Sequence, residues 1–132
     1  MFEIRSANPE LQPVFDAALK ARVGAMIPIR NSTMNLLAPR IAELAVKSRL
    51  ATMFERSGAV EQGGLASYTA DEIEGYRRAA VYVDKILKGA KPGELPVEQP
   101  TKFELAINLK TSKQIGLTIP PNVLARADKV IK

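Results

Sequence analysis

The stretch KILKGAKPGELPVEQPTKFELAINLKTSKQIGLTIPP (residues 85–121) decides the fold of this chain. A helix ends at its start, because Gly89 is a typical helix cap and Pro92 follows soon after it. Residues 91–100 are rich in turn formers and hold three prolines, so they cannot continue that helix. The run FELAINL (103–109) then predicts a strand, and KTSKQIG (110–116) predicts a short helix closed by its glycine. The last residues begin extended and are predicted to end as a helix that starts near Pro121.

Upstream of this stretch, strand patterns alternate with helix patterns. The predicted strands cover residues 2–5, 24–29, 50–54 and 64–68, and residues 55–64 are predicted to be a polar loop. The predicted helices begin at Asn8 with Pro9 in the first position, after the possible caps at residues 31–33, and at a capping box of Thr69 and Glu72. This order predicts an α/β fold: a three-layer parallel sheet with helices on both faces and right-handed crossovers.

Three apolar stripes indicate which helix faces are buried, and the run GAMIPI (24–29) indicates a strand covered on both faces. The stripes consist of Leu11, Phe15 and Leu19; of Leu37, Ile41, Leu44 and Ala45; and of Ile73, Tyr76, Ala80, Val83 and Leu87. At 132 residues, the chain is the size of one domain.

The composition excludes several classes of catalysis. The sequence has no cysteine and no histidine, so thiolate chemistry, serine triads and histidine-based zinc sites are impossible. We therefore expect a protein that is not an enzyme and that uses no cofactor. The net charge of +5 is spread along the chain without a basic stripe, which indicates a solvated surface and no nucleic-acid partner.

Polar residues follow two predicted strands, where ligands bind in open parallel sheets. After the first come Arg30, Asn31, Ser32 and Thr33, next to a helix N-terminus that favours an anion such as a carboxylate. Plain helix capping, and for Arg30 a solvated arginine, are the alternatives. After the second come Glu55, Arg56 and Ser57, which suit an amine, a hydroxyl or an acid, or form a solvated loop. Tyr68 follows the next strand and could stack on a ligand or pack at a hinge.

The motifs RIAELAVKSRL (40–50), GGLASY (63–68) and the long run from Tyr76 to Pro121 resemble the substrate-binding proteins of ABC transporters, in particular tryptophan- and phenylalanine-binding lipoproteins. The resemblance covers essentially the whole chain. It implies a type I periplasmic-binding-protein-like fold, in which a solute is held between two α/β lobes, with mostly the second lobe present. Residues 1–62 and 101–132 would be second-lobe-like, residues 63–90 a crossover strand and a first-lobe-like helix, and residues 91–100 a crossover loop.

The resemblance also implies partners and a location. A small organic solute, such as an amino acid or a carboxylate, and an ABC permease would be the partners of a periplasmic protein. The sequence opens without a signal peptide, so a chain that truly starts at Met1 would be cytoplasmic. The alternative function is then a standalone oligomerisation or regulatory module that kept the fold and lost transport.

The helix at residues 71–88 would pack on a first-lobe sheet that this chain lacks. An apolar stripe of that size needs a cover, so we expect a homodimer or a domain-swapped assembly through this helix. The alternative is that the helix folds back onto the chain's own small sheet.

Overall fold

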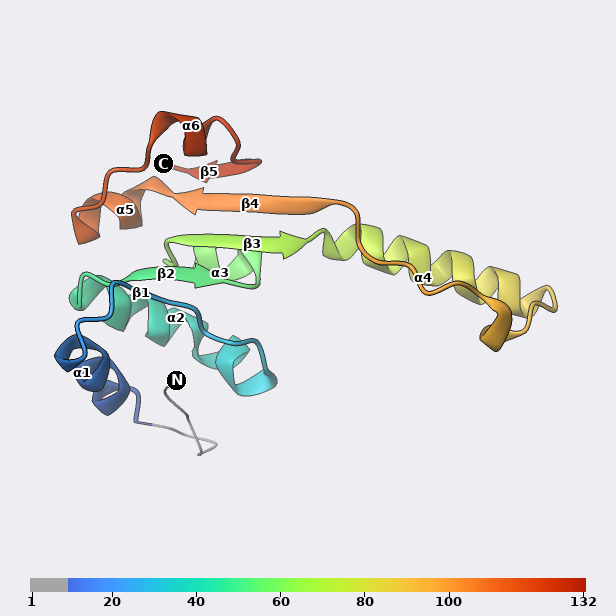
Figure 1. The fold of residues 1–132 in the computed structure, drawn as a ribbon, viewed down its shortest axis with the longest axis horizontal. Helices are drawn as coiled ribbons and strands as arrows, with labels where there is room; N and C mark the ends of the chain where they lie inside the picture. Colours follow the sequence, from blue (N-terminus) through green and yellow to red (C-terminus); the bar gives the residue numbers. More distant parts are fainter. Residues whose placement is uncertain (1–9) are drawn as a thin grey trace.

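The computed structural model describes residues 10–132, so the predicted strand at residues 2–5 and the cap at Asn8 lie outside the described residues. Its centre is a five-stranded sheet in the order β1-β2-β3-β4-β5 (Figure 1). The strands are β1 (Ala25–Met26), β2 (Ala51–Phe54), β3 (Ala66–Ala70), β4 (Phe103–Asn108) and β5 (Lys129–Ile131).

The sheet is mixed, which corrects the prediction of an all-parallel one. The pairs β1–β2, β2–β3 and β4–β5 are parallel, whereas β3 and β4 are antiparallel, with Ala66 opposite Ile107 and Ala70 opposite Phe103. The reason is the long connection between them, which leaves the end of β3 as a helix and returns beside that helix to the same end of the sheet (Figure 1). The returning strand must therefore run in the opposite direction.

Helices lie on both faces of this sheet, as predicted, but one face stays largely open, since Met53, Tyr68 and Phe103 on it are 37%, 56% and 45% exposed. The helices are α1 (Gln12–Lys20), α2 (Ser32–Lys47), α3 (Ser57–Glu61), α4 (Glu72–Leu87), α5 (Leu109–Ile115) and α6 (Pro121–Leu124), with a 3-10 turn, η1, at Pro92–Glu94. Side chains alternate along β2, so Phe54 joins a core with α1 and α2, while Ala51 joins a second core with Ile115 and Leu124.

The first core confirms most of the predicted burial on α1 and α2. Leu11 and Phe15 are buried, and so are Ile41, Leu44 and Ala45 of α2. Leu19 is exposed, which contradicts its place in the predicted stripe. Ala18 takes the inward position instead, because it lies seven residues after Leu11, which is nearly two full helical turns, and it is buried.

Strand β1 is much shorter than the predicted run of residues 24–29. Only Ala25 and Met26 pair with β2, and Ile27 and Ile29 are exposed, so the expectation of a strand covered on both faces was wrong. Pro28 has no N–H to donate to a sheet, which ends the pairing. Within residues 10–132, β1 is also the edge of the sheet, so it has a neighbour on one side alone.

Two short elements were missed. The segment predicted as a polar loop contains α3, whose Ala59 and Val60 are buried, and the predicted terminal helix is a single turn, α6, followed by β5. Strand β4 is therefore an inner strand between β3 and β5. Both missed elements are too short for periodicity to reveal them.

Helix α4 projects away from the sheet and buries none of its residues (Figure 1). Ile73, Tyr76, Val83 and Leu87 are 65%, 77%, 55% and 82% exposed, and Ala80 between them is exposed too. The alternative in which this helix folds back onto the chain's own sheet is therefore wrong. Lys88 caps its C-terminus and Gly89 follows in the left-handed conformation that glycine favours, at φ 100°.

Candidate ligand-binding site

The ends of β1 and β2, which the sequence indicated as two candidate positions, meet in the structure. Arg30, which follows β1, and Glu55 and Arg56, which follow β2, line one shallow pocket of about 20 Å³ together with residues of α2 and α3. Asn35 of α2 and Gln62 after α3 add two amide side chains to it. Those amides were missed: Asn35 lies one turn beyond the cap at Asn31, and Gln62 lies in a segment that was predicted to be a loop.

The cap of α2 accounts for Asn31. Its Oδ1 accepts a hydrogen bond of 2.8 Å from the N–H of Met34, and its backbone is extended, as at a helix N-cap. Ser32 and Thr33 form the first turn of α2, and neither of them lines the pocket of Arg30. Asn31 therefore caps α2.

Arg30 already has a partner in the structure. Its Nη1 lies 3.1 Å from Oε1 of Glu72, the first residue of α4, and both side chains are about half exposed. The positive N-terminal end of the α4 dipole also stabilises the carboxylate of Glu72. This ion pair ties the loop after β1 to the base of the projecting helix.

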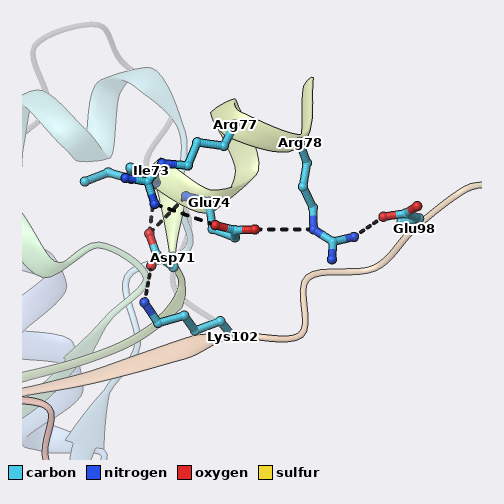
Figure 2. A network of polar contacts seen from close by, with 7 residues as sticks. All are labelled: Asp71, Ile73, Glu74, Arg77, Arg78, Glu98 and Lys102. Atoms are coloured by element: carbon cyan, nitrogen blue, oxygen red, sulfur yellow. Dashed lines mark hydrogen bonds and ion pairs between the residues drawn. The ribbon is translucent and has the colours of Figure 1, made fainter. Parts of the chain in front are cut away.

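Asp71 and Lys102 hold the two connections between the sheet and α4 together (Figure 2). Oδ1 of Asp71 accepts hydrogen bonds from the N–H groups of Ile73 and Glu74, at 3.0 and 3.1 Å, and so caps α4. Oδ2 accepts a bond of 2.8 Å from Nζ of Lys102, and the backbone N–H of Asp71 donates to the carbonyl of Lys102. The predicted capping box of Thr69 and Glu72 was wrong, since Asp71 is the cap.

These bonds shift the ionisation of both side chains. The hydrogen bond from Lys102, followed by the backbone bond from Glu74, holds the pKa of Asp71 below its usual range. In turn, the hydrogen bond to Asp71 and its negative charge raise the pKa of Lys102. The pair therefore stays ionised under neutral conditions.

The segment that returns from α4 to the sheet (residues 92–102, the return segment) is fixed along one side of α4. Arg78 pairs with Glu98, and the hydroxyl of Tyr82 donates to the carbonyl of Pro96 (Figure 2 shows the first of these contacts). A cavity of about 450 Å³ lies between this side of the helix and residues 92–102. The exposed apolar stripe lies on a different side of α4, since the residues that line this cavity include Arg78 and Tyr82 but none of the stripe.

Tyr68 does not join Arg30. Ser67 pairs with Phe54 in the register of β2 and β3, so Tyr68, its neighbour, faces the opposite side of the sheet. There it stacks on Phe103, with ring centroids 5.3 Å apart, above a cavity of about 290 Å³ that Arg126 and Asp128 help to line. Ser57, the remaining candidate, begins α3 and does not line the Arg30 pocket.

The described residues show neither a metal site nor a membrane span. Within residues 10–132, His, Cys, Asp and Glu side chains form no group of three that could hold a metal ion. None of the helices in this range is both long enough and apolar enough to cross a bilayer.

A family model described as ABC transporter substrate binding protein matches residues 4–131. The chain belongs to this family. The resemblance that its sequence motifs indicated is thereby confirmed, and no curated protein matches the chain.

Solved structures agree with this ABC substrate-binding fold. An ABC domain from Streptococcus pneumoniae in complex with L-Trp is 28% identical, with a TM-score of 0.84 over 98% of this chain and 43% of its own. A conserved domain protein from Vibrio cholerae is also 28% identical, with a TM-score of 0.81 over 91% of this chain and 40% of its own.

A third structure supports the fold alone. A ligand-free, open substrate-binding protein with adhesive properties from Clostridium difficile is 22% identical, with a TM-score of 0.69 over 98% of this chain and 42% of its own. The ABC substrate-binding chain described here thus spans about two fifths of the length of each of these neighbours.

Proposed function

We propose that this chain serves as the solute-binding component of an ABC uptake transporter. It binds a small organic solute, such as an amino acid or a carboxylate, between two lobes in the periplasm and delivers it to a permease without catalysis. The observation that carries this proposal is the meeting of Arg30, Glu55 and Arg56 at the ends of two parallel strands, in a chain of the substrate-binding family.

We assign complementary roles to these three side chains. Arg56, and Arg30 when it separates from Glu72, would bind the carboxylate of the solute, and Glu55 would bind an ammonium or a hydroxyl group. Because the pneumococcal relative was solved with L-Trp, aromatic amino acids are the first solutes to test. Tyr68 lies on the other face of the sheet, which argues for hinge packing instead of stacking on this solute.

The division into lobes is part of the same proposal. Residues 1–62 and 101–132 would form the second lobe, residues 63–90 a crossover strand and a first-lobe-like helix, and residues 91–100 the crossover loop. The projection of α4 from the sheet supports this division, and so does the antiparallel pair of β3 and β4, whose connections leave and enter at the same end.

Calorimetric titration tests the solute-binding role. The product of the complete reading frame is titrated with L-Trp, L-Phe and succinate, beside the variants Arg30→Gln and Arg56→Gln. We expect one of these solutes to bind and each variant to bind it at least about tenfold more weakly, since each loses a charge-assisted hydrogen bond. The matched control is Arg126→Gln on the opposite face, which should bind normally.

Equal affinity in all three variants would contradict the proposed site, and the absence of binding by any solute would contradict amino-acid or carboxylate transport.

We further propose that a second copy of the chain covers α4, as a homodimer or a domain-swapped assembly through residues 71–88. The exposed stripe on α4 supports this partner, because large apolar patches on soluble proteins usually mark interaction sites. Light scattering measures the mass of the 132-residue chain directly. A monomer at all concentrations would rule this assembly out.

The same stripe supports the alternative function of a cytoplasmic oligomerisation or regulatory module that kept the fold and lost transport. Cell fractionation separates the two functions. A tagged protein found in the periplasm supports uptake, and one found in the cytoplasm supports the module.

A further inference from the structure

We propose that Glu72 determines which charges the solute must carry, because its carboxylate competes with the carboxylate of the solute for Arg30. A solute with a cationic group beside its carboxylate is accepted, and a solute with carboxylates alone is disfavoured. This inference rests on the solute-binding function proposed above, and it adds the residue that selects among the solutes named there.

The position of Glu72 is the first observation. Its Oε1 lies 3.1 Å from Nη1 of Arg30, although Glu72 does not itself line the pocket that Arg30 shares with Glu55 and Arg56. Arg30 follows β1 of the sheet, whereas Glu72 begins α4, the helix that projects from the sheet (Figure 1). In the proposed division into lobes, this ion pair joins the second lobe to the first-lobe-like helix, at the boundary where a solute would be held.

The carboxylate of Glu72 is free to change its partner, because α4 does not depend on it. Asp71 accepts the hydrogen bonds from the N–H groups of Ile73 and Glu74, and it also binds Lys102 at the base of the helix (Figure 2). The side chains of Arg30 and Glu72 are both about half exposed, and ion pairs of this kind contribute little free energy. A carboxylate of the solute can therefore displace Glu72 from Arg30.

The charges around the pocket balance one another. Arg30 and Arg56 are positive, Glu55 and Glu72 are negative, and within residues 10–132 no further charged side chain lines this pocket. A solute with carboxylates alone leaves Glu72 without a partner and beside a like charge, which opposes binding. A solute that also carries a cationic group offers that group to Glu72, so two charge-assisted contacts replace the one that is broken.

Pairs of solutes that differ in the ammonium group alone test this role. The product of the complete reading frame is titrated calorimetrically with L-Trp and indolepropionate, with L-Phe and hydrocinnamate, and with succinate. We expect the unchanged protein to prefer the amino acid of a pair. Glu72→Gln keeps the size of the side chain but removes its charge. It should lower this preference about fivefold and strengthen the binding of succinate by a similar factor, as expected for an exposed ion pair.

Two further variants separate the charge of Glu72 from its place in the helix. Glu72→Asp keeps the charge and should keep most of the preference. Glu74→Gln removes an acid from the same turn of α4, where Glu74 pairs with Arg77 and Arg78 instead of Arg30, and it should bind each solute as the unchanged protein does. Circular dichroism checks that α4 is retained in all three variants.

The outcomes distinguish this role from the solute-binding function itself. A lowered preference in Glu72→Gln, with the preference kept in the other two variants, supports the competition. An unchanged preference in a protein that binds a solute overturns the competition and leaves the solute-binding function standing. Equal weakening of every solute in Glu72→Gln also overturns it, because Glu72 would then orient Arg30 for the solute. If the unchanged protein binds no solute, the proposed function and this inference fail together.

Discussion

Two buried hydroxyl groups on one face of the sheet have opposite relations to their surroundings. Thr52 Oγ1 accepts a hydrogen bond of 3.2 Å from the N–H of Leu65, which joins β2 to the start of β3. Ser67 Oγ is fully buried, yet it has no hydrogen-bond partner among residues 10–132. A buried hydroxyl without a hydrogen-bond partner destabilises the folded state, whereas a bonded one accepts from a buried N–H group that would otherwise be unpaired.

We therefore expect opposite effects when the two hydroxyls are removed. Thr52→Val keeps the shape but leaves the Leu65 N–H unpaired, and should lower the free energy of unfolding by about 1–3 kcal/mol. Ser67→Ala removes an unpaired group, and should leave that free energy unchanged or raise it slightly. Urea denaturation of both variants measures the difference. A large loss of stability in Ser67→Ala would mean that this hydroxyl has a partner that the described contacts do not include.

Single residues also show what the sequence could reveal about the site. The charged residues after β1 and β2 could be placed together, because the carboxyl ends of parallel strands meet at one edge of a sheet. The ion-pair partner of Arg30 could not be predicted, since Glu72 is distant in sequence and the two residues are brought together by the fold. The face of Tyr68 depended on strand register, which no local pattern determines.

At the scale of elements, length decided which predictions were confirmed. The long helices α2 and α4 have enough turns for an apolar period to be visible, and both lie where that period predicts them. Helix α3 has five residues and β5 has three, which is too few for either period. The antiparallel pairing of β3 and β4 follows from the path of the whole connection, so it could not be predicted from either strand.

The base of α4 gives an element-scale prediction that depends on pH. The pKa of Asp71 is lowered in the folded chain, mainly by Lys102, so this carboxylate stabilises the fold above the ordinary pKa of an aspartate, about 3.9. The contribution is lost as the pH falls through the lowered pKa. We therefore expect the protection of the Ile73 and Glu74 amides, measured relative to the intrinsic exchange rate at each pH, to fall as acid is added below about pH 3.9.

Variants separate the cap from the ion pair. Asp71→Asn keeps an oxygen that can accept from the two N–H groups but removes the charge that binds Lys102. It should abolish the acid dependence while protecting both amides, whereas Asp71→Ala should lose the protection as well. Hydrogen exchange followed by NMR measures both effects, and an unchanged acid dependence in Asp71→Asn would assign it to a different carboxyl group.

At the scale of the whole molecule, the sheet and its covering helices form a body to which α4 and the return segment are attached at one end. Helix α4 buries no residue, and Ala70 pairs directly with Phe103 across β3 and β4. The two strands could therefore be joined by a tight hairpin turn without disturbing either core.

This arrangement predicts that residues 71–102 are dispensable for folding of the body. Replacing them by Asn-Gly should preserve a dispersed NMR spectrum and change the free energy of unfolding of the body by less than about 1 kcal/mol. The shortened chain should also be a monomer, since it lacks the α4 surface. An unfolded product would show that the helix and its return segment support the sheet, and would contradict the division into lobes.

The narrow attachment of α4 also has a mechanical consequence. Its 16 residues make an arm of about 24 Å, and among residues 10–132 it is joined to the sheet through two adjacent strands and the contacts of Asp71, Lys102 and Glu72. A change of a few degrees in the twist of β3 against β4 would displace the far tip of the arm by roughly 2 Å, from the length of the helix. The breaking of one ion pair at this attachment, such as that between Arg30 and Glu72, would thus be amplified into a larger displacement at the far end of α4.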